Sequence, residues 1–501
     1  MANLLTRNRP LLVTLGIVVL MLIWMGTQYK PQVTASILLS GLTLGALYFL
    51  VTSGLSLIFG LMDVLNFAHG IFFMIGAYVG YTFYANPRLM LNTLPLLLAV
   101  LGGLVIGGRL AGVLRGPAQG SPTARAVIGA LGVVGGGLLL AAVWGLDLLA
   151  LAPIAGGAAS PTALSEPDGQ YLTRVLAALA AGLLLGLLRG WLEPARAGRR
   201  QLNLRSLVLG LAVAIIALIL VYTRESGAAF VLGLPSNGRF VLALVAGAAA
   251  GAVLGGLVEW SLIRPLYVRP IYQVLLTLGL VFVGTEAVKG IWGPTGFNME
   301  MPSQFATRGA DCRSATISDW LTKGCASIDV LGRPFPTYRL FIILLGVVMF
   351  IAITLLLRRS RLGMIIRAGV QDSEMVQALG INVRWIFTLV FALGTGLAAL
   401  GGVAAAPFIG VYPDMGQEFL LLAFIAVVIG GMGSFSGAAL GALLVGLARA
   451  FGDQLVTTGI HLPGLEEAVK FSPSIARAST VLLMAVVLLV RPAGLFGKKE
   501  T

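Results

Sequence analysis

The 501-residue chain is 58% hydrophobic and only 11% charged, with a mean hydropathy of +0.95. Soluble domains carry about twice that share of charged residues, so the composition excludes a large water-soluble catalytic domain. Two Cys and two His, without Cys-x-x-Cys or His-Glu-x-x-His spacing, argue against a metal site. No Gly-x-x-x-x-Gly-Lys-Ser/Thr loop is present to hold ATP, so no cofactor is expected and ATP-driven work would require a partner.

About fourteen apolar segments follow one another along the chain, separated by polar or basic residues. A bilayer crossing takes roughly 20 apolar residues, and most segments come close to that length. The sequence therefore predicts an all-α, polytopic transmembrane helix bundle. Two of the segments, 70–84 and 418–433, are short for a full crossing, which indicates broken or re-entrant helices. The expected spans are 11–28, 34–59, 70–84, 91–108, 126–152, 171–188, 205–222, 239–262, 271–291, 339–357, 386–406, 418–433, 436–452 and 475–490.

Lys and Arg residues gather on one side of the predicted bundle. With the N-terminus in the cytoplasm, the cytoplasmic loops hold 20 of them and the opposite loops hold 9. This asymmetry is the positive-inside pattern, and it accounts for the net charge of +14 without nucleic acid as a partner. It places both termini and loop 358–384 in the cytoplasm, and it places loop 293–338 on the outer side.

The first span, within segment 1–33, has a basic start followed by an apolar stretch. That pattern is typical of a membrane helix and also of a signal peptide, for which Val33 and Ala35 would be the small residues at the cleavage site. Polar residues 28–31 separate the apolar stretch from that site, so an uncleaved N-terminal transmembrane helix is favoured.

Glycine is the most distinctive part of the composition, with 66 residues. Ten of them form pairs four positions apart, a spacing that places both glycines on one helix face and lets a neighbouring backbone approach. Such pairs are common in apolar helices, so they predict close helix packing and no particular function. The pairs are Gly41/Gly45, Gly76/Gly80, Gly182/Gly186, Gly251/Gly255 and Gly437/Gly441.

A polar break at 60–70 separates two apolar runs. It contains Asp63, Asn66 and His69, and hydrogen-bonding groups beside a membrane are costly unless they face protein or a water-filled cavity. The structural interpretation is that Asn66 and His69 satisfy backbone groups freed where a helix breaks. The functional interpretation is that Asn66, His69 and Gly70 border a translocation path, and both interpretations can hold together.

The basic cytoplasmic loop contains a second departure from apolar sequence. Asp372 can cap a short helix there, and Gly380 can end it. Between them, Met375, Val376 and Leu379 have i, i+1, i+4 spacing and would lie on one apolar face. Such a face requires a surface that buries it, which is a partner protein, the chain itself or the lipid headgroups.

A third departure is a Gly- and Ser-containing turn at 428–437, which joins two short apolar segments. Its placement resembles that of the break at 60–70, because both interrupt a pair of short apolar helices. The similarity hints at two related halves of the kind that many transporters contain.

The only two cysteines, Cys312 and Cys325, lie 13 positions apart in the polar loop 293–338. An oxidising compartment would favour a disulfide between them, whereas a cytoplasmic loop would keep both thiols reduced. Two free thiols are the alternative, because sequence alone does not show that the Cβ atoms come within bonding distance. A loop on the outer side of the membrane is therefore expected to contain the disulfide.

Several short motifs stand out along the chain, of which the strongest runs from Ser-Arg-Leu-Gly-Met at 360–364 to Ala-Leu-Gly-Ile-Asn at 378–382. Further motifs lie at 41–48, 66–70, 74–78, 259–266, 277–279, 292–294, 430–434 and 491–495. Together and in this order they resemble the LivH-type permeases of branched-chain amino acid ABC importers. The closely similar permeases of urea and short-chain amide importers leave the solute open.

The resemblance implies an all-helical permease of a bacterial inner membrane, which forms the translocation path and catalyses no reaction itself. In such importers the loop matching 367–382 is the coupling helix that docks on an ATPase subunit. The residues that this assigns to the contact are Asp372, Met375, Val376, Ala378, Leu379 and Gly380. The implied partners are a LivM-like second permease, two cytoplasmic ATP-binding subunits and a solute-binding protein on the outer side.

The resemblance also divides the chain into parts. The permease core is expected in segments 34–90 and 239–497, and segment 91–238 is an insertion without a counterpart in the family. About four crossings fit within the insertion, and an even number returns the chain to the side that it left. The orientation of the later spans is therefore expected to be unchanged.

Two other classes of function compete with the importer. An ion-coupled secondary transporter would work alone and would need ionisable groups near the bilayer midplane. Glu259, Glu286 and Lys289 lie toward the ends of their spans and Asp147 lies in the insertion, so no midplane charge pair stands out. A membrane-embedded enzyme would need a nucleophile and base or a metal constellation, and the sequence offers neither.

Overall fold

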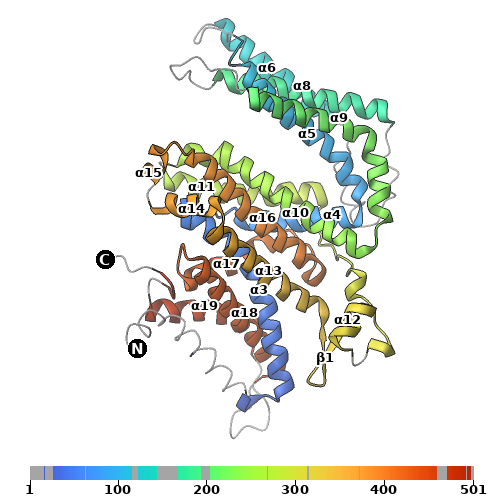
Figure 1. Cartoon of the computed structure of the whole chain (residues 1–501), viewed down its shortest axis with the longest axis vertical. Coiled ribbons are helices and arrows are strands. Elements are labelled where there is room, and N and C mark those ends of the chain that lie inside the picture. The colour runs from blue at the N-terminus through green and yellow to red at the C-terminus, as the bar shows by residue number, and fades with distance from the viewer. Residues whose placement is uncertain are drawn as a thin grey trace. The chain divides into compact units, whose positions relative to one another are not determined.

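The computed structural model describes residues 26–62, 64–114, 122–143, 167–192, 204–267, 269–312, 315–371, 373–459, 471–491 and 494–497, together with Gly16 (Figure 1). Most of the expected first span lies outside these ranges, as do Asp63, Asp147 and Asp372. Within them the chain is almost entirely helical. Nine of the described helices are long and apolar enough to cross a membrane, so the polytopic all-α bundle is confirmed.

Contacts divide the chain into two compact units. The first unit comprises Met1–Tyr81, Ser236–Lys289 and Pro294–Thr501, and the second comprises Thr82–Pro235 with Gly290–Gly293. The second unit overlaps the expected insertion 91–238, whose boundaries stay a prediction.

The first unit is built around α16 (Val383–Ile409), whose middle is buried on all sides. Small residues in this helix let the neighbouring backbones approach closely, and in Figure 1 α10 runs side by side with it. Among the described residues, this unit also contains α3 (Pro31–Met62), α4 (His69–Ala85), α10 (Ser236–Val258), α11 (Pro270–Trp292), α13 (Thr337–Arg359), α14 (Arg361–Gln371), α15 (Ser373–Ala378), α17 (Met415–Gly430), α18 (Phe435–Thr458) and α19 (Pro473–Val490).

The described residues of the second unit lie mainly in four helices. A Cβ atom added at Gly182 would lie 2.3 Å from the carbonyl oxygen of Val100, so α5 and α8 are in backbone contact. Arg224 of α9 is 2% exposed, because it pairs with Asp168 at 3.0 Å and covers the ring of Tyr171. The helices are α5 (Pro87–Leu110), α6 (Pro122–Val143), α8 (Asp168–Leu192) and α9 (Leu204–Gly233).

The apolar pattern located the helices well. Each segment predicted between residues 34 and 490 overlaps a described helix, and residues 144–152 of segment 126–152 lie outside the described ranges. The expectation of close packing at the five glycine pairs is also confirmed, since a Cβ atom at any of the ten positions would lie within about 3 Å of a neighbouring helix. Apolar periodicity and small residues therefore determine much of this fold.

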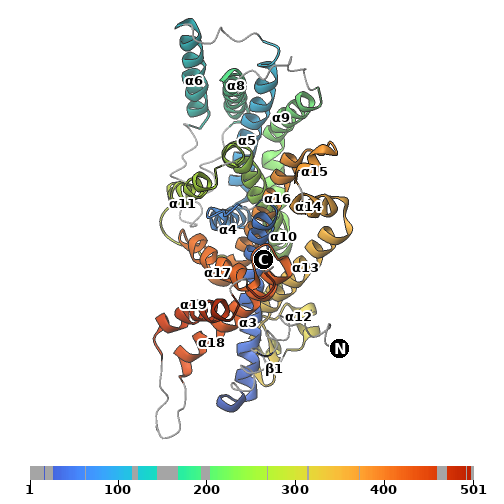
Figure 2. The same cartoon turned by 90° about the vertical axis from the view of Figure 1, so that its left-hand side faces the viewer.

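The segment between α11 and α13 contains more structure than a polar loop. Strands β1 (Ser327–Val330) and β2 (Arg333–Pro336) form an antiparallel hairpin, and α12 (Ile317–Lys323) precedes them. Figure 2 shows this hairpin beside the first turns of α3. The turn residues Leu331 and Gly332 both have positive φ angles, and leucine is rare at such a position, which is why the sequence did not predict the hairpin.

A π-helical turn (Glu259–Ile263) and a short 3-10 helix (Arg264–Leu266) extend α10. The backbone N–H of Arg264 donates to the carbonyl of Glu259, five residues earlier. A π turn widens the helix locally and rotates the side chains that follow it, and such turns are frequent at functional sites. Here it brings three polar side chains to the same end of α10.

Candidate functional site

The break between α3 and α4 returns the chain alongside α3. His69, the first residue of α4, lies beside Val51 and Gly54, roughly three turns before α3 ends at Met62. The non-helical residues 64–68 therefore run within the depth of the bundle. Non-helical backbone at that depth is tolerated where protein buries it or where it borders a cavity.

His69 is fully buried and its ring is bound to the backbone. The Nε2 atom donates to the carbonyl oxygen of Val51 at 3.0 Å, while the buried Nδ1 atom has no hydrogen-bond partner among the described residues. The backbone N–H of His69 also donates to the carbonyl of Asn66. These contacts connect the start of α4 to α3 and stabilise the break.

Asn66 is also buried, at 2% exposed, yet neither of its amide atoms has a hydrogen-bond partner in the described part of the chain. A buried amide without a partner costs about 1–3 kcal/mol, which makes this residue an exception that calls for a role. Unlike His69, Asn66 borders a cavity of about 300 Å³. The cavity is lined by Leu55, Leu65, Asn66, Phe67, Leu278, Val281, Phe282, Gln417, Leu420, Leu421 and Phe424.

The walls of this cavity are apolar apart from two amides. Asn66 and Gln417 are the polar side chains among the lining residues, and Phe67 stacks on Phe424 with ring centroids 6.4 Å apart. A volume near 300 Å³ is at the lower end of the range for small-molecule sites. The arrangement suits a small molecule that has an apolar part and a few hydrogen-bonding groups.

Gly70 contributes space rather than chemistry. A Cβ atom at this position would lie 2.1 Å from the carbonyl oxygen of Gly416 and 2.8 Å from the Cβ of Leu420. Any larger side chain would push the start of α17 away from the start of α4. Because Leu420 and Gln417 line the cavity, Gly70 fixes the position of that wall.

The glycine-rich turn between α17 and α18 meets the end of α3. A Cβ atom at Gly60 would lie 3.0 Å from the Cα of Gly433, so the two interruptions noted in the sequence lie close to each other at that point. Segment 494–497 completes the turn, because the N–H groups of Leu495 and Phe496 donate to the carbonyls of Ile429 and Gly430 at 2.9 Å each.

The expected coupling segment forms a short helix, α15. Gly380 has a φ of +81°, and its N–H donates to the carbonyl of Gln377, while the N–H of Ile381 donates to that of Val376. This pair of hydrogen bonds ends the helix in a Schellman motif, which requires the left-handed conformation that glycine adopts without strain. The end predicted at Gly380 is confirmed.

The apolar side chains of α15 point in two directions. Met375 and Leu379 are 60% and 72% exposed, whereas Val376 is 3% exposed. Val376 is thus covered by its own chain while Met375 and Leu379 are not, so the single apolar face expected to dock with all three residues is wrong. Ala378 and Gly380 are exposed beside Leu379, and Asp372 lies outside the described residues.

Cys312 and Cys325 are joined in a disulfide, with their Cα atoms 5.5 Å apart. Both are buried beside Ala315, in the segment that also holds the hairpin. The backbone N–H and the hydroxyl of Thr316 donate to Asp319, and together with Lys323 they lower the pKa of that carboxyl to about 2. The segment is thus a small folded element of its own.

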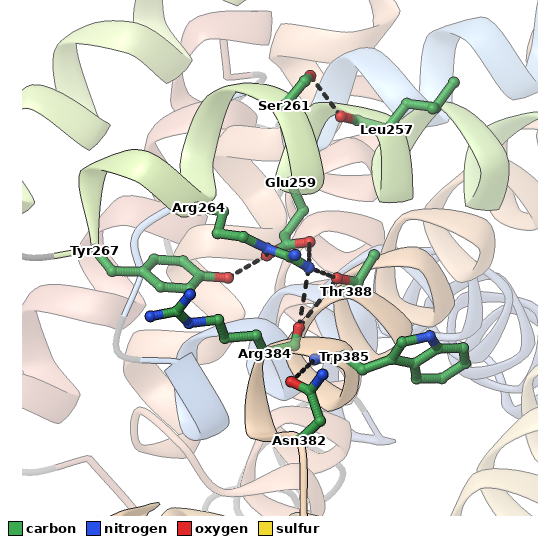
Figure 3. Close-up of polar contacts among 9 residues, drawn as sticks. All are labelled: Leu257, Glu259, Ser261, Arg264, Tyr267, Asn382, Arg384, Trp385 and Thr388. Carbon is green, nitrogen blue, oxygen red and sulfur yellow. Dashed lines mark hydrogen bonds and ion pairs between the residues drawn. The ribbon is translucent and has the colours of Figure 1, made fainter. Parts of the chain in front are cut away.

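A polar cluster at the end of α10 contains a buried ion pair (Figure 3). Glu259 is fully buried, and the guanidinium of Arg264 donates to both of its carboxylate oxygens at 3.3 Å. The hydroxyl of Tyr267 donates to the same carboxylate, and Arg264 also donates to the carbonyl of Arg384 at 3.1 Å and to the hydroxyl of Thr388. The sequence showed Glu259 as an embedded charge, but it did not show that Arg264, which binds Glu259, has its partners on α16 at positions 120 and 124 residues further along the chain.

Broken helices around a buried polar segment are typical of membrane transport proteins. A family model described as "Branched-chain amino acid transport system / permease component" matches residues 204–491. The match covers more than half of the chain, and the chain belongs to this permease family. The matched region begins at α9, inside the segment expected to be an insertion.

Individual relatives match shorter parts. The high-affinity branched-chain amino acid transport system permease protein LivH of Escherichia coli K12 is 35% identical over 30% of this chain and 44% of its own length. BraD of Pseudomonas aeruginosa, with the same description, is 38% identical over 32% and 48%. The autoinducer 2 import system permease protein LsrD of Salmonella paratyphi B is 27% identical over 52% and 69%. The chain thus spans about half the length of LivH and BraD, and no solved structure gives a significant match.

Proposed function

We propose that the chain is the transmembrane permease subunit of an ATP-binding-cassette importer for branched-chain, hydrophobic amino acids. Membership of the permease family supports the transport role, and the names of LivH and BraD support the solute class. The observation that carries the proposal is the cavity beside Asn66. Its apolar walls and two amides match a solute with an aliphatic side chain and polar backbone groups.

Each residue of the break has a separate task in this proposal. The amide of Asn66 has no hydrogen-bond partner among the described residues. It binds water when the path is empty, and it binds the ammonium or carboxylate of the solute during transport. His69 holds the break against α3, and Gly70 lets α17 form the opposite wall of the path. Urea has no apolar part that could pack against the aromatic and leucine side chains around this amide.

Coupling to ATP hydrolysis takes place at α15. Met375 and Leu379 provide the exposed apolar surface that docks on an ATPase subunit, with Ala378 and Gly380 beside them. Val376 points inward and fixes the helix to its own chain. Asp372 precedes the helix in the sequence and is proposed to cap it.

The complete importer would contain two cytoplasmic ATP-binding subunits, a second LivM-like permease and a solute-binding protein that meets the segment 293–338. The chain would lie in a bacterial inner membrane with both termini in the cytoplasm, as the Lys and Arg distribution indicates. Labelling of intact cells with a membrane-impermeant maleimide tests this orientation. Labelling at Cys312 and Cys325 only after reduction is expected, whereas labelling only after the membrane is opened would contradict it.

The solute is tested by uptake into vesicles that contain the assembled transporter. Radiolabelled leucine, isoleucine and valine should accumulate with ATP, and unlabelled urea, short-chain amides and autoinducer 2 should not compete. Competition by one of these compounds together with absent leucine uptake would assign another solute. Uptake without any ATPase subunit would instead favour an ion-coupled transporter.

The coupling role is tested by Leu379→Glu. Burial of a large apolar side chain contributes roughly 1.5–3 kcal/mol. A charge at this position should therefore lower the affinity of the ATPase subunit for the permease at least tenfold. The variant should still reach the membrane, because Leu379 is exposed within its own chain. Val376→Ala is the matched control, and it should lower stability without weakening the ATPase contact. Normal uptake by Leu379→Glu at normal expression would contradict the proposal.

A further inference from the structure

The polar cluster at the end of α10 connects this helix to the start of α16. Arg264 donates hydrogen bonds to Glu259 at the end of α10. It also donates to the carbonyl of Arg384 and to the hydroxyl of Thr388 in the first turns of α16 (Figure 3). The ring of Tyr267 packs edge-on against Phe387, also in α16, with centroids 5.6 Å apart. The buried carboxylate of Glu259 thereby positions Arg264 and Tyr267, which make these three contacts between α10 and α16.

The same two helices also fit together along their length. A Cβ atom at Gly251 would lie 2.3 Å from the Cβ of Ala399, and one at Gly255 would lie 2.0 Å from the hydroxyl of Thr395. Contacts this close leave no room for the helices to slide past each other, since packed interfaces do not deform continuously. The polar cluster lies at one end of an interface that is closely packed along its length.

The coupling segment joins α16 directly at that end. Only residues 379–382 separate α15 from α16, and Asn382 caps α16 by accepting a hydrogen bond from the N–H of Trp385. The N–H of Ile381 donates back to Val376, which is buried. A displacement of α15 therefore reaches the first turn of α16 through a short, hydrogen-bonded connection.

We infer that Glu259, Arg264 and Tyr267 are positioning residues that fasten the coupling end of α16 to α10, so that the two helices move as one body when the ATPase moves α15. The inference rests on the proposed function, because the ATPase contact is part of it. A buried ion pair gives little net stability compared with well-packed apolar residues, and its best-attested use is to specify one arrangement. In this chain the arrangement is the register of α10 on α16.

A disulfide between the two helices tests the inference. A Cβ atom at Gly256 would lie 3.4 Å from the Cβ of Ala392, close to the separation that a disulfide needs. The two native cysteines are already bonded to each other, so Gly256→Cys with Ala392→Cys provides the only added thiols. The single variants Gly256→Cys and Ala392→Cys are the controls, because they receive the same oxidant and form no bridge.

Uptake and ATP hydrolysis are measured in vesicles with the assembled transporter, before oxidation, after oxidation and after reduction. We expect the bridged protein to keep both rates within twofold of the single variants, because α10 and α16 do not separate during transport. A loss of uptake of tenfold or more that reduction reverses would overturn the inference. Failure of the bridge to form would also count against it, because two helices in constant register keep these Cβ atoms together.

A second readout separates positioning from ordinary stabilisation. In Glu259→Gln the carboxylate is lost, and the number of ATP molecules hydrolysed for each solute transported should rise at least threefold, with partial rescue in Glu259→Asp. A merely structural residue would lower both rates in proportion and leave this ratio unchanged, which would contradict the inference. The uptake of wild-type vesicles is measured first and tests the proposed function by itself, so the two failures are distinguishable.

Discussion

Two buried polar regions of the first unit differ in how their hydrogen bonds are satisfied. At the break, the amide of Asn66 is buried without a hydrogen-bond partner in the described part of the chain, and it borders a cavity. At the end of α10, the carboxylate of Glu259 is even more deeply buried, but Arg264 and Tyr267 bind it. Both regions place polar atoms where water is scarce, and only one of them leaves such atoms available.

Under the proposed function, Asn66 meets the solute, whereas Glu259 maintains the structure. An unsatisfied buried amide weakens the fold unless something binds it for part of the working cycle. A satisfied ion pair gives a ligand nothing to bind, but removal of one member leaves an uncompensated charge. Substitutions should therefore change stability strongly at Glu259 and transport strongly at Asn66.

The largest effect on stability is expected for Glu259→Ala. The guanidinium of Arg264 would lose its carboxylate, at a cost of about 3 kcal/mol, the low end of the range for buried pairs because a quarter of the Arg264 side chain is exposed. Thermal unfolding of the purified protein in detergent measures it. The control is Glu286→Ala, which breaks an exposed ion pair with Lys289 and should cost far less. Equal losses in the two variants would remove the distinction between the regions.

A smaller effect is expected for Tyr267→Phe, about 1 kcal/mol for the lost hydrogen bond to Glu259. Burial, and then the bond to Glu259, raise the pKa of the Tyr267 phenol above 10. The stability that the protonated phenol contributes is present below pH 10 and is lost as the pH rises above it, because the unfolded tyrosine ionises first. Unfolding measured between pH 9 and pH 11 should therefore depend less on pH in the variant, and identical pH profiles would contradict this account.

The smallest loss of stability is expected for Asn66→Leu, because no described residue loses a hydrogen bond and the amide that is removed has no partner among them. Uptake should nevertheless fall about tenfold, the loss expected when one hydrogen bond to a charged solute disappears. Uptake at matched expression and the melting temperature are measured together. A strong loss of stability with unchanged uptake would show that Asn66 belongs with Glu259 as a structural residue.

The sequence predicted the parts of this site that depend on local pattern. Apolar runs located the helices, the polar residues of 60–70 marked the break, and Gly380 marked the end of α15. Each of these signals acts within a few positions, through hydropathy or through the conformational freedom of glycine. The same is true of Cys312 and Cys325, which are close in sequence and lie next to each other in the structure.

What the sequence did not predict depends on contacts between distant segments. Arg264 and Thr388 are 124 positions apart, and nothing local to either residue indicates that they meet. Val376 is 3% exposed, and α15 packs against α14 and α16, so its burial depends on tertiary packing and not on spacing alone. The depth of the break likewise follows from the position of Val51 in α3, which hydropathy does not report.

The contact between segment 494–497 and the end of α17 bears on how the protein is made. The last carbonyls of α17, at Ile429 and Gly430, receive their hydrogen bonds from Leu495 and Phe496. A ribosome synthesises those donors only after α18 and α19, so α17 enters the membrane before its final partners exist. These two carbonyls therefore lack these donors until the residues after α19 have been synthesised.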